Sequence, residues 1–182
     1  ALHLTFAFIT FAYTLWVALD LIYPNKTQVI VPLRNLARIS FVFLILQIIY
    51  GGFVAGLNAG LIHNHWPLMS DGQLIHDSVF IEKSTLFLNL IEGKSGVQFV
   101  HRIMAYVVVG LILALYFNSK KYSLTSLQKK GINILVLIVF LQFTLGVFTL
   151  LFRVPLSLGL LHQVVAFFLL TAMTFTLHRF SK

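Results

Sequence analysis

Residues 141–170 read LQFTLGVFTLLFRVPLSLGLLHQVVAFFLL, in which two apolar runs are separated only by the short segment 153–155. Each run belongs to a stretch of roughly 20 residues, the length that a helix needs to cross the hydrocarbon core of a bilayer. A connection this short requires the two helices to be antiparallel neighbours. The sequence therefore predicts adjacent membrane-spanning helices at residues 131–152 and 157–177.

Three further apolar runs of similar length cover residues 1–23, 36–57 and 97–117. Hydrophobic residues make up 59% of the chain and charged residues only 10%, whereas a soluble domain is about half apolar and a quarter charged. Helices satisfy their own backbone hydrogen bonds in lipid, and a barrel would need shorter, alternating segments. We predict an all-α integral membrane protein surrounded by lipid, in which one transmembrane helix precedes a four-helix transmembrane bundle.

The formal net charge of +8 raises the question of a nucleic-acid partner. The basic residues instead gather in the connections between apolar runs, at 24–38 and 118–130, and at the C-terminus. Such Lys- and Arg-rich connections face the cytoplasm or the mitochondrial matrix. We therefore expect no nucleic-acid partner, a C-terminus on that inner side, and a long connection at about 58–96 on the outer side. The chain has no cysteine, which excludes disulfides and thiolate metal sites.

Histidines recur at matching places in three of the predicted helices. Each is followed four residues later by alanine: His101 with Ala105, His162 with Ala166, and His3 with Ala7. The helices that precede the first two carry a second pattern, Gln47 with Gly51 and Gln142 with Gly146. The patterns predict an internal repeat, with two copies at 36–117 and 131–177 and the end of another copy at 1–23.

All three histidines lie within about two helical turns, roughly 10 Å, of the predicted outer ends. Polar side chains inside membrane spans are costly and usually face a cavity or a partner. Imidazole suits iron, copper and zinc, and two histidines from facing helices suit the axial positions of a haem. A single intramembrane histidine is more often a packing residue. The repetition at one depth favours His101 and His162 as ligands of haem iron.

Other polar residues allow two interpretations each. Arg102 and Arg153, at the outer helix ends, could contact haem propionates or anchor the helices at the interface. Gln47 and Gln142 could orient a ligand histidine or form hydrogen bonds between helices, which is the interpretation that we prefer here.

Four more histidines lie outside the predicted site. His63, His65 and His76 are in the outer connection without an evident third metal ligand, so solvated side chains are expected. His178 is 16 residues beyond His162, about 24 Å along a helix, which places it at the opposite membrane face.

Three blocks of the sequence resemble the haem A synthase family: QIIYGGFVAGLNAGLIHNHWPLM at 47–69, VQFVHRIMAY at 97–106, and the stretch 141–170 quoted above. The resemblance implies eight transmembrane helices in two pseudo-symmetric four-helix halves. Residues 1–23 would be the last helix of the N-terminal half and 24–35 an inner loop. Residues 36–182 would form the C-terminal half, with its outer loop at about 58–96.

The resemblance also implies chemistry. Members of the family oxidise the C8 methyl group of haem O to a formyl group, giving haem A for cytochrome c oxidase. By this resemblance His101 and His162 would bind a haem b cofactor and His3 would lie on the substrate side. The proposed catalytic carboxylate belongs to the half that this chain lacks, so the catalytic residues are unknown and the isolated chain could be inactive.

The resemblance further implies haem O as substrate, haem O synthase and an electron-transfer protein as partners, and a bacterial or mitochondrial inner membrane as location. An oligomer is compatible with the sequence. On physical grounds alone, an electron-transfer subunit of cytochrome b type, with a haem between two histidines, fits the same residues and stays open as the alternative.

Overall fold

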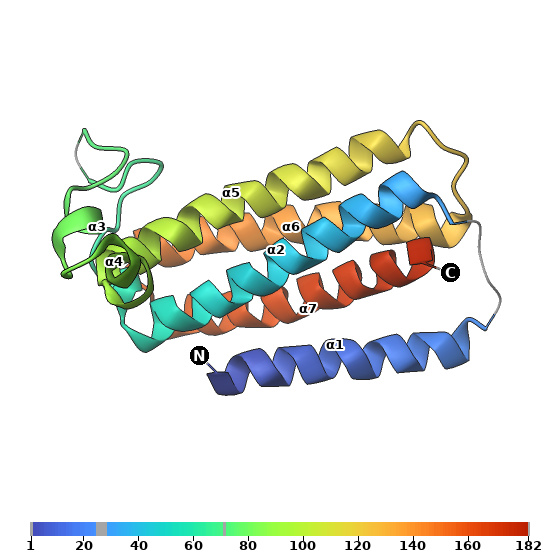
Figure 1. The fold of residues 1–182 in the computed structure, drawn as a ribbon, viewed down its shortest axis with the longest axis horizontal. Helices are drawn as coiled ribbons and strands as arrows, with labels where there is room; N and C mark the ends of the chain where they lie inside the picture. The colour runs from blue at the N-terminus through green and yellow to red at the C-terminus, as the bar shows by residue number, and fades with distance from the viewer. Residues whose placement is uncertain (1, 25–28, 71, 182) are drawn as a thin grey trace.

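The computed structural model describes all residues except 1, 25–28, 71 and 182, so Lys26, Asp71 and Lys182 lie outside the described residues. Five long helices and three short ones make up the regular structure of the described chain (Figure 1). They are α1 (Leu2–Ile22), α2 (Val31–Gly56), the 3₁₀ helix η1 (Ala59–Leu61), α3 (Ser78–Ile81), α4 (Leu86–Glu92), α5 (Lys94–Ser119), α6 (Ser126–Leu151) and α7 (Leu156–Ser181).

The five long helices are each long and apolar enough to cross a membrane, which confirms the predicted all-α integral membrane class. Several extend beyond the predicted apolar runs because polar residues continue the helical backbone. The second helix begins at Val31, with Pro32 in its first turn, where the missing N–H of proline costs nothing. Helix α6 begins after Thr125, whose side chain and that of Gln128 form a reciprocal capping box.

Successive long helices run in opposite directions, so the connections gather at two ends of the bundle (Figure 1). We call the end that holds η1, α3, α4 and the α6–α7 turn the loop end. The other holds the α1–α2 and α5–α6 connections and the C-terminus, and we call it the basic end. Most of the Lys and Arg residues of the described chain lie toward the basic end: Arg34, Arg38, Lys120, Lys121, Lys129, Lys130 and Arg179.

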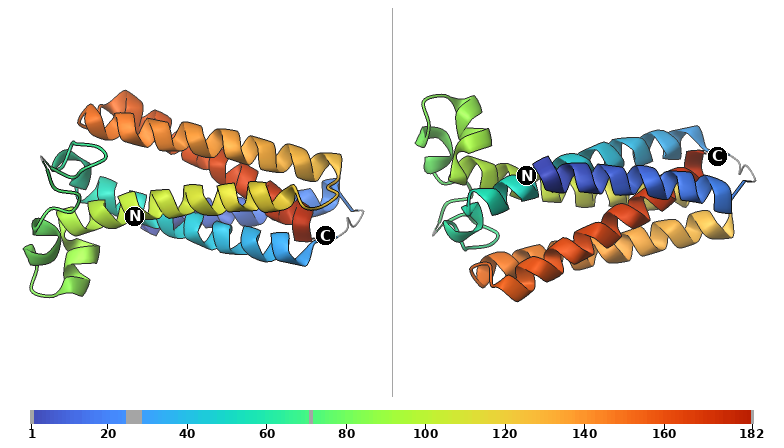
Figure 2. Two further views of the ribbon diagram at one scale, coloured as in Figure 1. Left: turned by 90° about the horizontal axis from the view of Figure 1, so that it is seen from above. Right: turned by 90° about the horizontal axis from the view of Figure 1, so that it is seen from below.

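The bundle is built from two helix pairs, α2 with α5 and α6 with α7, and α1 packs against α7 and α2. The views in Figure 2 show the two pairs diverging toward the loop end. The fully buried hydrophobic residues belong mostly to the basic-end half, where all four helices contribute. They include Leu33, Ala37, Leu44, Ile112, Leu115, Ile132, Leu135, Leu170, Met173 and Phe180.

The loop-end half of the bundle is not packed in this way. No residue is fully buried in stretches 99–107 of α5, 140–151 of α6 or 156–164 of α7. Protein interiors are normally close-packed, with few voids larger than a water molecule. The described helices therefore bury fewer side chains completely toward the loop end than toward the basic end.

The long outer connection contains two short helices, α3 and α4, with a break between them. The buried side chain of Asn89 explains the break. Its amide nitrogen donates to the carbonyls of Phe80, Lys83 and Thr85, and its oxygen accepts from the Lys83 N–H. These bonds reverse the chain between α3 and α4.

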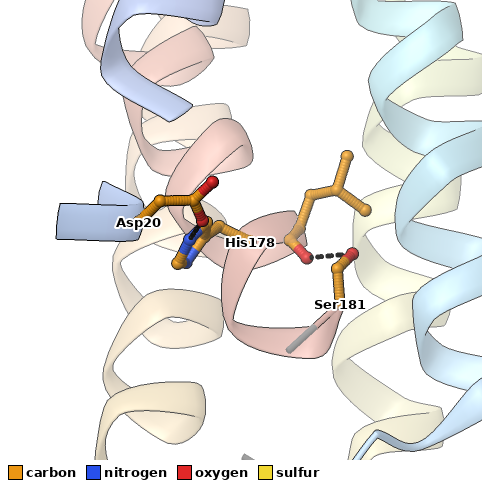
Figure 3. A network of polar contacts seen from close by, with 4 residues as sticks. Asp20, His178 and Ser181 are labelled. Carbon is orange, nitrogen blue, oxygen red and sulfur yellow. Dashed lines mark hydrogen bonds and ion pairs between the residues drawn. The ribbon is translucent and has the colours of Figure 1, made fainter. Parts of the chain in front are cut away.

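One polar pair joins α1 to the rest of the bundle near the basic end (Figure 3). His178 Nε2 lies 2.8 Å from Asp20 Oδ1, the His178 side chain is fully buried, and the Trp16 ring packs edge-on against the imidazole at 5.0 Å. Sequence analysis placed His178 at the membrane face but did not identify its partner. An aspartate inside an apolar run is expensive unless it is paired, so this contact fixes α1 against α7.

We expect Asp20→Ala and His178→Phe each to lower the free energy of unfolding by about 1–2 kcal/mol, the upper range for side-chain bonds between membrane helices. Thermal unfolding in detergent, followed by circular dichroism, measures the change. Ser181→Ala is the matched control, because the Ser181 hydroxyl donates to Leu177 within its own helix (Figure 3). Equal stability of all three variants would contradict the role of the pair.

Candidate functional site

His101 projects from α5 toward α2, near the loop end. Its Nε2 atom lies 3.4 Å from the side-chain nitrogen of Gln47. Its Cε1 atom lies so close to Gly51 that a Cβ added there would stand 3.2 Å from it. The glutamine and the glycine are one helical turn apart on α2, so the imidazole fits between an amide and a position without a side chain.

His162 on α7 repeats this arrangement against α6. Its Nε2 atom lies 3.1 Å from the side-chain nitrogen of Gln142, and a Cβ at Gly146 would stand 3.0 Å from its Cε1 atom. Each helix pair therefore holds one histidine between a glutamine and a glycine, as the repeat in the sequence suggests. We call these two arrangements the slots.

The two slots contain buried polar atoms without a hydrogen-bond partner among the described residues. They are Nδ1 of His101, Nδ1 of His162 and the side-chain oxygens of Gln47 and Gln142. Such atoms are uncommon in folded proteins because each unmade bond costs about 1–3 kcal/mol. Each imidazole thus has one nitrogen in contact with an amide and one that is unused.

This geometry suits a flat group with a metal at its centre. Two imidazoles on separate helix pairs, each with a nitrogen that lacks a partner among the described residues, lie in the half of the bundle where few residues are fully buried. No cluster of three or more His, Cys, Asp or Glu side chains able to hold a bare metal ion occurs among the described residues. The residues present therefore fit a haem better than a metal ion alone.

Arg102, adjacent to His101, is engaged with the backbone of the outer connection. Its Nη1 atom donates to the carbonyls of His65 and Leu68, and its Nη2 atom donates to the carbonyl of His63 at 2.5 Å. Only Nε lacks a partner within the described residues. The side chain ties the segment 63–68 to the loop end of α5.

Arg153 lies in the α6–α7 turn and is exposed. Both Arg153 and Val154 have positive φ, 59° and 57°, a conformation that costs a β-branched residue such as valine about 1–3 kcal/mol. The turn is supported by the outer connection, because Asn64 donates to the Leu150 carbonyl and the Val154 side chain packs on Gly60.

Aromatic contacts join the outer connection to both α5 and α6. Trp66 donates its indole N–H to the Tyr106 hydroxyl at 2.9 Å, and both rings pack against Phe143 of α6. Residues 60–68 thus contact α5, α6 and the α6–α7 turn. This segment covers the loop end of the bundle above the two histidines.

His63 and His76 belong to a polar cluster on this cover, and sequence analysis expected them to be solvated. Their ring centroids lie 4.7 Å apart with the planes tilted by 40°, and both rings contact the hydroxyl of Ser78, which donates to Ser95. Burial lowers the pKa of His63, and the neighbouring His76 and Arg102 lower it further. The cluster therefore favours a neutral His63.

His3 lies on the first turn of α1, and its side chain is exposed. The helix packs on the bundle through other residues, among them Phe8, Ala12 and Leu19. The structure therefore does not bring His3 together with the two slot histidines. It also places two apolar grooves of about 480 and 370 Å³ beside α1, and neither is lined by a histidine.

Comparison with known proteins gives a consistent result. Residues 1–174 match the model of a family described as cytochrome oxidase assembly protein, COX15-CtaA. Haem A synthases of Flavobacterium johnsoniae and Flavobacterium psychrophilum are 73% and 70% identical over all of this chain and 54% of their own length. A haem A synthase of Wolbachia pipientis is 38% identical over 93% of this chain and 47% of its own. The chain spans about half the length of these curated relatives, and no solved structure matches it significantly.

We expect Arg102→Leu to release the segment that covers the loop end. Hydrogen bonds to a charged donor contribute about 1.5–3 kcal/mol each, so amide hydrogen exchange in residues 63–69 should become roughly tenfold faster or more. Exchange measured by mass spectrometry tests this, with Arg153→Leu as the matched control at the same end of the bundle. Unchanged exchange in the Arg102 variant would show that its three carbonyl contacts do not hold the segment.

Proposed function

We propose that this chain, which belongs to the family of cytochrome oxidase assembly proteins, is the haem b-binding C-terminal half of a haem A synthase, preceded by one helix of the other half. In this division residues 1–23 are the last helix of the N-terminal half and 24–35 an inner loop. Residues 36–182 form the half that binds haem b. The observation that carries the proposal is the pair of glutamine–histidine slots in the loop-end half of the bundle.

His101 and His162 would hold the haem iron from opposite helix pairs. The haem would supply one-electron transfer, and two imidazole ligands leave no coordination position for oxygen. The chain's own contribution is to hold both rings in place and to exclude water with residues 60–68. Arg153, exposed in the α6–α7 turn, is the better candidate for a propionate contact, because Arg102 already donates to three carbonyls.

The activity of the whole protein, in this proposal, is the oxidation of the C8 methyl group of haem O to the formyl group of haem A. His3, exposed on α1 away from the slots, would belong to the substrate side. The catalytic residues would lie in the other half, and this chain alone would be inactive. Haem O synthase, an electron-transfer protein and further copies of the chain are the partners that we propose.

The chain is a multi-pass membrane protein, and we propose a bacterial or mitochondrial inner membrane as its location. The basic end would face the cytoplasm or matrix, since Lys- and Arg-rich connections remain on that side. Both slots would then lie near the outer face. Membership of this family does not favour the alternative of an electron-transfer cytochrome b subunit.

We expect His101→Ala and His162→Ala each to abolish the low-spin haem spectrum of the purified full-length protein, because one axial ligand is lost. Optical absorption of the reduced and oxidised forms measures this. His65→Ala is the control, since it replaces a histidine outside the two helix pairs and keeps the backbone oxygen that accepts from Arg102. A double variant with an unchanged spectrum would rule out haem binding at these histidines.

Cells that lack the full gene should accumulate haem O and contain no haem A, because the proposed oxidation is missing. Haem extraction followed by chromatography measures both. The full gene should restore haem A, and a gene with His101→Ala should not. If haem A persists without the gene, the proposed activity is wrong, whatever haem the purified protein binds.

A further inference from the structure

Gln47 and Gln142 make the same contact in the two halves of the internal repeat. Each projects from the helix that precedes its histidine helix, and each places its amide within 3.4 Å or less of the imidazole Nε2 atom. The two pairs are 54 and 20 residues apart in sequence, so neither contact follows from local helix geometry. The helix pairing itself creates both.

The ordinary role of a buried glutamine in this bundle is visible at Gln128. Its side-chain nitrogen donates to the Arg179 carbonyl, and its oxygen accepts from the Thr125 N–H, so both ends of the amide bond to backbone. The side-chain nitrogen of the buried Gln98 likewise donates to a backbone carbonyl, that of His63, although its oxygen lacks a partner among the described residues. Gln47 and Gln142 differ because their partner is a histidine ring. Joining two helices would not require an imidazole as the partner.

The slot also fixes where each ring can lie. Gly51 and Gly146 follow the two glutamines by one turn, and a methyl group at either position would come within 3.0–3.2 Å of the ring. Contacts this close are rare for real Cβ atoms, so each ring is confined between an amide on one side and bare backbone on the other. Confinement of this kind restricts the ring plane as well as its position.

An imidazole that binds a metal through one nitrogen needs its other N–H held by an acceptor, which fixes the tautomer and raises the basicity of the ligand. The unpartnered oxygens of Gln47 and Gln142 can supply that acceptor, since a half-turn of each amide exchanges its nitrogen and oxygen at the ring. The Nε2 atom then carries the proton. The unused ring nitrogen keeps its lone pair for the metal.

We propose that Gln47 and Gln142 are positioning residues, which fix the tautomer and ring plane of His101 and His162 and so lower the reduction potential of the iron between them. The inference rests on the proposed haem site and deepens it. An acceptor on a ligand N–H increases electron donation to the metal and stabilises the ferric state. The two glutamines act in the same direction because their contacts are equivalent.

The test is a potentiometric titration of the haem in the full-length protein with Gln47→Leu, Gln142→Leu, and the matched Gln47→Glu and Gln142→Glu variants. Leucine removes the acceptor at similar volume, so each leucine variant should raise the potential and shift the Fe(III)/Fe(II) equilibrium by about tenfold, which equals 59 mV for one electron. Glutamate keeps an acceptor, and its potential should remain at or below that of the wild type. The ferric electron paramagnetic resonance spectrum should change in the leucine variants, because the ring planes are released.

Ser40→Ala is the control, since Ser40 is a fully buried polar residue of α2 that bonds only within its own helix. It should leave potential and spectrum unchanged. Potentials that do not distinguish leucine from glutamate would overturn the positioning role while the haem site stands. Loss of haem from leucine and glutamate variants alike would also overturn it, because glutamate preserves the acceptor. Absence of haem from the unmutated protein would instead defeat the proposed function.

Discussion

The contact between a glutamine amide and a histidine ring, made once in each helix pair, is the constraint that organises the loop-end half of the bundle. In hydrocarbon there is no water to satisfy an imidazole, so a partner must come from a neighbouring helix. A side chain in place of Gly51 or Gly146, one turn from the glutamine, would crowd the ring, because its Cβ would stand 3.2 or 3.0 Å from the imidazole. The requirement therefore explains why glutamine, glycine and histidine recur together in the sequence.

The packing of the helices differs between the two ends of the bundle. Toward the basic end, close-packed leucine, isoleucine and methionine side chains hold the four helices together. Toward the loop end the helix pairs diverge, and each is held by its own glutamine–histidine contact (Figure 2). The apolar core thus lies mainly in the basic-end half, and the proposed haem site lies in the other half.

Much of this organisation was predictable, because hydropathy and repetition are strong signals in membrane helices. The five spans and the recurring histidine slots follow from residues such as Gln47, Gly51 and His101, whose spacing repeats. The Asp20–His178 pair could have been found by asking what satisfies a lone acid within an apolar run. The carbonyl contacts of Arg102 could not be predicted, since no repeated spacing in the sequence indicates where the loop between Gly56 and Lys94 folds back. Nor could the break that Asn89 makes between α3 and α4.

Arg102 connects the cover to the site, because it adjoins a slot histidine on α5. His101 faces α2, while the next residue reaches up to three carbonyls of the outer connection. Aromatic contacts of Trp66 carry that connection on to α6. A redox group depends strongly on the dielectric and the water around it. With haem bound as proposed, the guanidinium that holds residues 63–68 to α5 would help to exclude water from the haem through its carbonyl contacts.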